Sequence, residues 1–300
     1  MQTEQVRIES VQCISPAGLH RMFYKDWGDV ANPNILVCVH GVTRVADDFD
    51  VLARELMRDY RVICPDVVGR GRSDWLKAPQ YYQLPQYVSD MVTLLARLNT
   101  NKISYLGTSM GGMIGMVLAS LPENPIQKLI LNDIGPAMNL ASLEFISDYI
   151  GQSIKFSTFD EAAQYIRSIS PTFGQHTEEQ WNKIAKDVLR QDKDGSWIKH
   201  YDLNIAIPMR QGVNPEALRV IESTLWAQYD AIRCPTLLLR GAESALISEE
   251  TAIQMTERGP KAQLVEFPKV GHAPTLVHAE QIAPIREFLL RSNSPKKMFP

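Results

Sequence analysis

Residues 102–121 read KISYLGTSMGGMIGMVLASL, a short apolar run that ends at a glycine-flanked serine and continues as a helix-like segment. A strand, a tight turn with Ser109 at its apex and a helix are the context in which G-x-S-x-G has chemical meaning. Such a turn strains the serine backbone and leaves no room for side chains at Gly107 and Gly111. We expect the Ser109 hydroxyl to project at a helix N-terminus, where the Met110 N–H can face a developing oxyanion.

The composition is typical of a water-soluble globular protein with a large core. The chain has 300 residues, of which 45% are hydrophobic and 22% are charged. This length fits one α/β domain that carries an insertion. The net charge of −3 is dispersed, so we expect neither nucleic acid nor membrane as a partner. The N-terminal MQTEQVRIES is polar, and we therefore expect no signal peptide and a cytoplasmic protein.

Four cysteines are spread along the chain without C-x-x-C pairing: Cys13, Cys38, Cys64 and Cys234. Three of them lie in or beside predicted strands, which indicates buried free thiols in a reducing compartment. No metal-ligand spacing is present, so we expect neither a metal nor any other cofactor.

Strands and helices alternate over most of the chain. Apolar or alternating runs predict strands over 6–14, 19–27, 34–39, 60–64, 103–106, 126–132, 236–241 and 262–267, with helical spacing between most of them. This order predicts a mostly parallel sheet covered by helices on both faces. The pattern changes between 138 and 229, where three helical stretches (140–150, 159–169 and 177–189) replace the buried strands. We therefore predict a core of 1–137 and 230–300 with a helical cap inserted at 138–229.

Six motifs follow the predicted strands in a fixed order: HGVTR (40–44), PDVVGRGRSDW (65–75), GTSMGG (107–112), NDIGP (132–136), LLLRGAESALIS (237–248) and VGHAPTL (270–276). Along almost its whole length, the chain resembles the α/β-hydrolase superfamily. The resemblance implies an eight-stranded α/β-hydrolase fold and is weakest in the cap.

The resemblance implies roles for individual residues. Ser109 is the expected nucleophile rather than a plain helix cap, and His272 in the turn after the last strand is the expected base. The N–H groups of Val42 and Met110 are the expected oxyanion donors. We interpret His40 as a structural residue that fixes the Val42 loop. For Arg44, which follows in the same loop, we favour an exposed position over one at the mouth of the site.

The acid of the triad is where the sequence departs from the family. Relatives of this type end the seventh strand with RGA-x-SD, whereas this chain reads RGAESA over 240–245. Ala245 therefore occupies the position of the expected aspartate. We favour a deliberate Asp-to-Ala substitution, because the neighbouring motifs are intact, and expect reduced activity from it. Asp133 and Glu243 are the alternative acids, although we interpret Asp133 first as a brace for nearby backbone N–H groups.

These residues predict a serine hydrolase that cleaves a small carboxylic ester or lactone through an acyl-enzyme. Hydrolytic C–C cleavage of a diketone-type ring-cleavage product ranks second, because such enzymes usually carry tryptophan where this chain has Ala273. A non-catalytic ligand-binding protein on the same scaffold is the alternative from another class, and Ala245 is its only support. A homodimer stays open. Aromatic and sulfur side chains of the cap are left unassigned between pocket and cap core: Met138, Phe145, Phe173, Trp181, Trp197, Trp226 and Tyr229.

Overall fold

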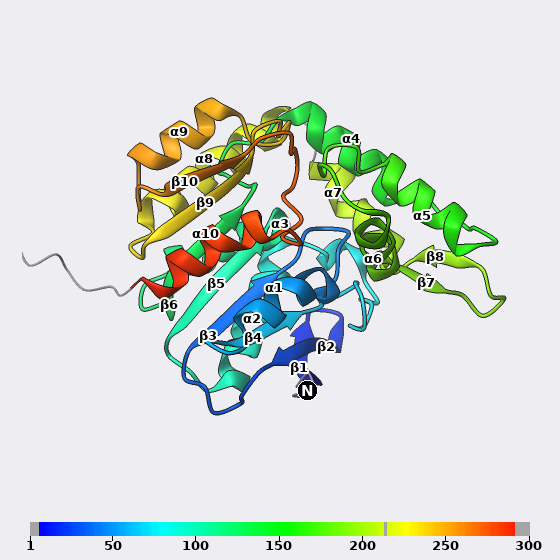
Figure 1. Ribbon diagram of the computed structural model, residues 1–300, viewed down its shortest axis with the longest axis horizontal. Helices are drawn as coiled ribbons and strands as arrows, with labels where there is room; N and C mark the ends of the chain where they lie inside the picture. The colour runs from blue at the N-terminus through cyan, green and yellow to red at the C-terminus, as the bar shows by residue number, and fades with distance from the viewer. Residues whose placement is uncertain (1–5, 213–214, 292–300) are drawn as a thin grey trace, which may run out of the picture.

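The computed structural model describes residues 6–212 and 215–291, and its centre is one eight-stranded sheet (Figure 1). The strand order is β1-β2-β4-β3-β5-β6-β9-β10. Only β1 with β2 and β2 with β4 pair antiparallel, and the other neighbours are parallel. The bounds are β1 Val6–Ser15, β2 Gly18–Trp27, β3 Ile35–Val39, β4 Arg61–Pro65, β5 Ile103–Thr108, β6 Ile126–Asn132, β9 Thr236–Gly241 and β10 Gln263–Phe267. The predicted α/β architecture is confirmed.

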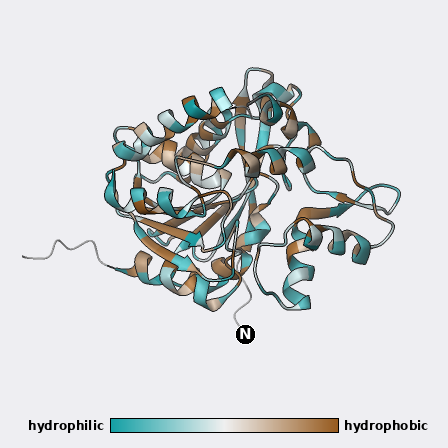
Figure 2. Cartoon of the chain, turned by 90° about the horizontal axis from the view of Figure 1, so that it is seen from above, coloured by the Kyte–Doolittle hydropathy of each residue, from teal (hydrophilic) through white to brown (hydrophobic). Residues whose placement is uncertain are grey.

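Both faces of the sheet are buried, which explains why the parallel strands are continuous apolar runs. In β3, Val37 and Val39 belong to the hydrophobic cluster on one face, whereas Leu36 and Cys38 belong to the cluster on the other. The first cluster includes residues of α2 (Leu84–Leu98), α3 (Met110–Ser120) and α9 (Glu249–Glu257). The second includes residues of α1 (Asp50–Leu56) and α10 (Ala279–Leu290). In Figure 2, hydrophobic residues concentrate on the strands between these helices.

The chain between β6 and β9 leaves the sheet and builds a small substructure, seen on the right of Figure 1. It comprises α4 Leu140–Ile150, α5 Phe159–Ser168, α6 Glu178–Val188, the hairpin of β7 Leu189–Gln191 with β8 Trp197–Lys199, and α7 Ala206–Gly212. Thr158 and Thr177 are the N-cap residues of α5 and α6, and each forms a capping box that fixes where its helix begins. Residues of α5 and α6 share a separate hydrophobic cluster.

Helix α8 (Pro215–Ala231) corrects the expected extent of the cap. The sequence pattern extends the predicted cap to residue 229, but α8 packs against α3 of the core. Leu225 and Tyr229 are buried in the same cluster as sheet residues such as Leu131. The physical reason is that α8 presents an apolar face to the sheet side, as a core helix does.

Short 3₁₀ helices complete the fold: η1 Ala46–Phe49, η2 Pro79–Tyr81 and η3 Leu203–Ile205. Over residues 6–212 and 215–291, none of the helices has the length and apolar character needed to cross a membrane. The first five residues of the polar segment used for the signal-peptide prediction lie outside the described chain.

Candidate active site

The turn between β5 and α3 has the strained geometry that the sequence predicts. Ser109 has φ 51° and ψ −116°, a conformation that residues with side chains rarely adopt. A Cβ on Gly107 would lie 2.3 Å from the Gly111 carbonyl carbon, and a Cβ on Gly111 would lie 2.0 Å from the Val39 oxygen. Both positions therefore require glycine. The Ser109 hydroxyl does not cap α3, so it is free to make a contact elsewhere.

Ser109, His272 and Asp133 form one continuous chain of hydrogen bonds. The Ser109 Oγ lies 3.0 Å from His272 Nε2, and His272 Nδ1 lies 2.8 Å from Asp133 Oδ2. An ionised carboxylate only accepts hydrogen bonds, so Nδ1 carries the proton and Nε2 is left to accept from the serine hydroxyl. His272 is 21% exposed and Asp133 is fully buried. The histidine is thus open to a substrate while its partner is shielded from water.

Asp133 follows β6 directly and is held from three sides. Its Oδ1 accepts from the Gly241 N–H at 2.8 Å, and its Oδ2 accepts from the Ser244 hydroxyl at 2.6 Å as well as from His272. The brace role expected for Asp133 is therefore present, but it is combined with the contact to His272. The sequence favours position 245 as the place of the acid, whereas the carboxylate that bonds to His272 in the structure belongs to Asp133.

Ala245 lies away from this hydrogen-bond chain. It is exposed, its carbonyl accepts from the Ser142 hydroxyl at 2.7 Å, and its side chain lines a wide cavity. Glu243, the third candidate acid, is exposed as well. The orientation of His272 does not depend on a carboxylate at position 245, because Asp133 at the end of β6 supplies one.

The two expected oxyanion donors stand close to Ser109. In the described part of the chain, neither the Val42 N–H nor the Met110 N–H donates to a protein acceptor. Met110 is the first residue of α3, where a helix leaves its N–H groups unpaired. Two unpaired donors beside an activated hydroxyl can receive the negative charge of a tetrahedral intermediate.

His40 supports the loop that carries Val42, as predicted. Its Nε2 accepts from the Val67 N–H at 2.9 Å, so its Nδ1 carries the proton and donates to the Gly41 carbonyl at 2.7 Å. Complete burial lowers the pKa of His40 to about 4, which keeps the ring neutral. A charged His40 could not accept the Val67 N–H, and the loop would lose that bond.

Arg70 is a supporting residue that the sequence reasoning missed. It is completely buried, and its guanidinium donates to the Val42 carbonyl at 2.8 Å and the Tyr87 hydroxyl at 3.0 Å. A buried arginine is rare unless it is fully bonded. The signal was present in the GRGRS segment, where an arginine between glycines stands in a loop next to a buried strand.

Arg44 corrects the expectation of an exposed side chain. Only 14% of its side chain is exposed, and it holds Asp48 with two hydrogen bonds of 2.7 and 2.6 Å. Its guanidinium lies 5.9 Å from the centre of the Phe173 ring. Both Arg44 and Phe173 line the cavity that contains Ser109.

Two cavities meet at His272. A narrow one of about 90 Å³ contains Ser109 and Val42, and a wide one of about 810 Å³ contains Ala245. His272, Ile146 and Tyr149 line both cavities. Residues of helix α4 thus line both cavities, and both cavities are lined by the same histidine.

The unassigned cap side chains fall into three groups. Met138 and Phe145 line the wide cavity, and Phe173 lines the narrow one. Trp181 and Trp197 belong to the hydrophobic cluster around α5 and α6. Trp226 and Tyr229, on α8, belong to the core instead.

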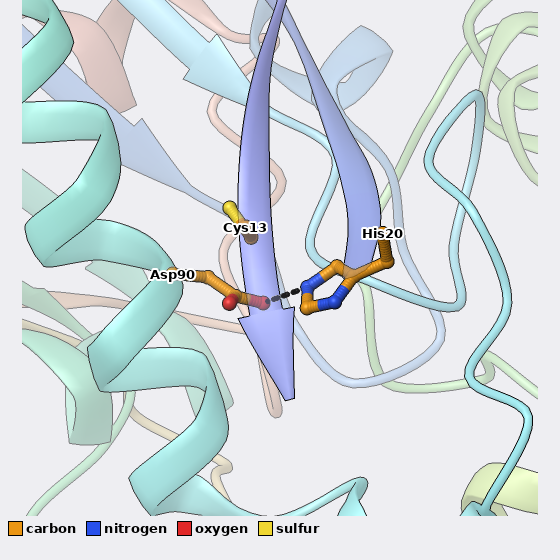
Figure 3. Close-up of side chains that lie close together, drawn as sticks. All are labelled: Cys13, His20 and Asp90. Carbon is orange, nitrogen blue, oxygen red and sulfur yellow. Dashed lines mark hydrogen bonds and ion pairs between the residues drawn. The ribbon is translucent and has the colours of Figure 1, made fainter. Parts of the chain in front are cut away.

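A second polar cluster lies apart from Ser109, between the β1–β2 hairpin and α2 (Figure 3). Cys13, His20 and Asp90 are buried, with their ligand atoms within 4.8 Å of one another, so they have the residue types of a metal site. The Asp90 carboxylate is already occupied by His20 Nε2 at 2.9 Å and by Gln86 Nε2 at 2.8 Å. Burial, first of all, raises the pKa of the Cys13 thiol to about 12, which disfavours the thiolate that a metal needs. This cluster is best described as a buried hydrogen-bonded contact between the hairpin and α2.

Comparison with known proteins agrees with this geometry. The family model described as alpha/beta hydrolase fold matches residues 34–279. The chain belongs to the α/β-hydrolase family. A 3-hydroxybutyrate-oligomer hydrolase from Cupriavidus necator is 52% identical over 94% of this chain and 97% of that protein. Esterase YbfF from Escherichia coli is 26% identical over 83% of this chain and 89% of the esterase.

A solved structure extends the agreement to three dimensions. The α/β hydrolase from Novosphingobium aromaticivorans superposes with a TM-score of 0.83 at 36% identity, covering 94% of this chain and 98% of the other. The chain is thus an enzyme of the hydrolase class, and hydrolysis of carboxylic esters is the activity that its relatives support.

Proposed function

We propose that this hydrolase cleaves short esters of 3-hydroxy acids, such as oligomers of 3-hydroxybutyrate, through an acyl-enzyme on Ser109. The observation that carries the proposal is the unbroken chain from the Ser109 hydroxyl through His272 to the buried Asp133. The substrate class is suggested by the relative from Cupriavidus necator, which is similar over almost the full length of both chains.

In the first half-reaction, Ser109 Oγ attacks the ester carbonyl carbon and its proton passes to His272 Nε2. Asp133 holds the ring in the required tautomer and stabilises the imidazolium. The N–H groups of Val42 and Met110 hold the oxyanion of the tetrahedral intermediate. The intermediate collapses when the C–O bond to the alcohol breaks and Nε2 returns its proton to the leaving oxygen.

In the second half-reaction, water replaces the alcohol. His272 Nε2 takes a proton from the water as its oxygen attacks the acyl carbon, and the same nitrogen then protonates Ser109 Oγ as the acid leaves. Every proton taken is returned, and no redox step occurs. The protein side of this reaction needs only the residues already named.

We further propose that residues 138 to about 212 form the cap that shapes the substrate site. Ile146 and Tyr149 of α4 and Ile184 of α6 line the Ser109 cavity, so this segment supplies walls that the sheet does not. Replacing 138–212 by a short linker should change ester selectivity and leave a folded core. Cooperative unfolding of the whole protein on removal would refute a separable cap.

The function is tested with a fluorophosphonate probe and an ester panel. Wild-type enzyme should be labelled at Ser109 and should hydrolyse 3-hydroxybutyrate oligomers and p-nitrophenyl esters, whereas Ser109→Ala should do neither. His272→Gln, the matched control that keeps the nucleophile but removes the base, should label on the order of 10³-fold more slowly. A folded wild-type protein that resists the probe and hydrolyses no ester would overturn the proposal.

A further inference from the structure

We infer that the enzyme removes one 3-hydroxyacyl unit at a time from the hydroxyl end of an oligomer, with the rest of the chain in the wide cavity. This inference rests on the proposed function and adds the direction and size of each cut. It is built on the two cavities that meet at His272.

The positions of the catalytic groups decide which cavity takes which part of the ester. The leaving oxygen must receive a proton from His272 Nε2, so the alcohol part extends past the histidine. The acyl part stays beside Ser109 and the oxyanion donors. The wide cavity is lined by His272 but by neither Ser109 nor Val42, whereas the narrow cavity is lined by all three. The wide cavity is therefore the leaving-group side and the narrow one the acyl side.

The sizes of the two cavities limit what each can hold. The narrow cavity, of about 90 Å³, is about nine times smaller than the wide one. We assign it the smaller part of the ester, a single 3-hydroxybutyryl group. The wide cavity of about 810 Å³ has room for several units. Cleavage should therefore place one unit on Ser109 and release the remainder as the alcohol.

The charged residues that line the narrow cavity are balanced in charge. They include Arg44 paired with Asp48 at 2.6 Å, and Lys183 paired with Asp187 at 2.6 Å. Each cation is matched by a carboxylate, so this charged lining offers no net positive charge to a substrate carboxylate. Donors and acceptors side by side suit a neutral hydroxyl, which can accept from an ammonium and donate to a carboxylate.

The wide cavity has a different lining. Apart from His272, the residues that line it are uncharged, and they include apolar groups such as Met138, Phe145 and Leu246 as well as the hydroxyls of Ser142, Ser170 and Thr172. A 3-hydroxybutyrate chain likewise combines methyl groups with ester oxygens. The free carboxylate of the chain has no cation to meet there, so it is expected to point out of the cavity toward water.

The direction is tested on wild-type enzyme with a linear trimer of 3-hydroxybutyrate that carries ¹³C only in its carboxyl-terminal unit. At early times, cleavage at the hydroxyl end gives unlabelled monomer and labelled dimer. Labelled monomer with unlabelled dimer, or equal amounts of both patterns, would overturn the inference. If the trimer is not cleaved although Ser109 reacts with the probe and p-nitrophenyl esters are hydrolysed, the inference fails and ester hydrolysis stands.

End-blocked trimers give an independent readout. Acetylation of the terminal hydroxyl should lower kcat/KM at least about tenfold, because the acyl unit no longer fits the narrow cavity. Methylation of the carboxylate should change it less than about threefold, because that end faces water. The reverse ranking would show that the chain binds in the opposite direction.

Asp187→Asn tests the charged lining of the narrow cavity itself. We expect the ratio of kcat/KM for p-nitrophenyl 3-hydroxybutyrate to that for p-nitrophenyl butyrate to fall about tenfold, because a charged acceptor for the hydroxyl is lost. Glu179→Gln, on the exposed side of the same helix, is the matched control and should keep the wild-type ratio. An unchanged ratio in Asp187→Asn would remove this charged lining from substrate recognition.

Discussion

The loops that follow β6 and β9 start at neighbouring points of the sheet but place their residues in different environments. The two strands are paired in parallel, with Asn132 opposite Leu239, so both end beside His272. The β6 loop places Asp133 in a fully buried position, and the β9 loop leaves Ala245 exposed. The carboxylate that bonds to His272 is that of the buried Asp133. The two loops thus differ in which of them is buried next to the histidine.

The β9 loop still serves the acid, although it does not supply it. Gly241 and Ser244 donate to the two oxygens of Asp133 at 2.8 and 2.6 Å. A carboxylate that accepts several hydrogen bonds is held in one orientation. The two loops therefore form one unit. The β6 loop provides the carboxylate, and the β9 loop provides the hydrogen-bond donors that hold it.

The largest effect is expected at the end of β6. Asp133→Asn should lower kcat on the order of 10⁴-fold, because the amide can no longer hold the productive tautomer of His272. Initial rates on a p-nitrophenyl ester measure this loss, and thermal unfolding checks that the variant is folded. A folded variant that retains more than a tenth of the activity would show that His272 does not depend on Asp133.

A third strand end, after β3, carries His40, which supports the loop with the Val42 N–H. Burial lowers the pKa of His40 from 6.5 to about 4, so the unfolded chain binds a proton more readily than the folded one. The stability that the neutral ring provides is complete above about pH 6.5 and is lost as the pH falls toward 4, by about 3 kcal/mol in total. Urea unfolding between pH 7 and 4 should show a weaker pH dependence in His40→Gln than in wild type. Equal slopes would contradict a buried neutral His40.

A smaller effect is expected from the support that β9 gives to the acid. Ser244→Ala removes one of the bonds to the Asp133 carboxylate and leaves His272 in contact with it. Loss of a hydrogen bond to a charged group should lower kcat by about tenfold, or roughly 1.4 kcal/mol in the barrier. The control is Ser89→Ala, a change at an exposed serine of α2 that lines neither cavity, which should leave kcat close to wild type. Equal rates in the two variants would show that Ser244 has no part in the site.

The smallest effect is expected at position 245 itself. Ala245→Asp should change kcat less than about threefold, because the Nδ1 proton of His272 already has its acceptor in Asp133. The same substitution in the Asp133→Asn background shows whether the second loop can supply the acid. A gain of several powers of ten in the single variant would place the acid at the end of β9.

The fold and the strained turn around Ser109 could be predicted from the sequence because they depend on local patterns. The apolar runs of strands buried on both faces and the glycines around Ser109 are dictated by short-range geometry, and the structure has both. The change of pattern after β6 could be recognised for the same reason. The place of α8 against the core could not, because it depends on the long-range contact with α3.

The acid and the supporting residues could not be predicted in the same way. Asp133 and Ala245 lie far apart in sequence, and only the folded chain shows that Asp133 bonds to His272 while Ala245 is exposed. Arg44 and Arg70 carry charges that usually indicate exposure, yet both are covered by parts of the chain that come together only on folding. The local sequence pattern identifies candidate residues, and the tertiary contacts decide which of them lie in the site.

The central claim is that His272 donates its Nδ1 proton to Asp133, and proton NMR of that hydrogen tests it most directly. With a boronic acid bound to Ser109 as a transition-state mimic, the wild-type enzyme should show one strongly downfield Nδ1–H resonance. The resonance should persist in Ala245→Asp and disappear in Asp133→Asn. Its survival in Asp133→Asn would contradict the account.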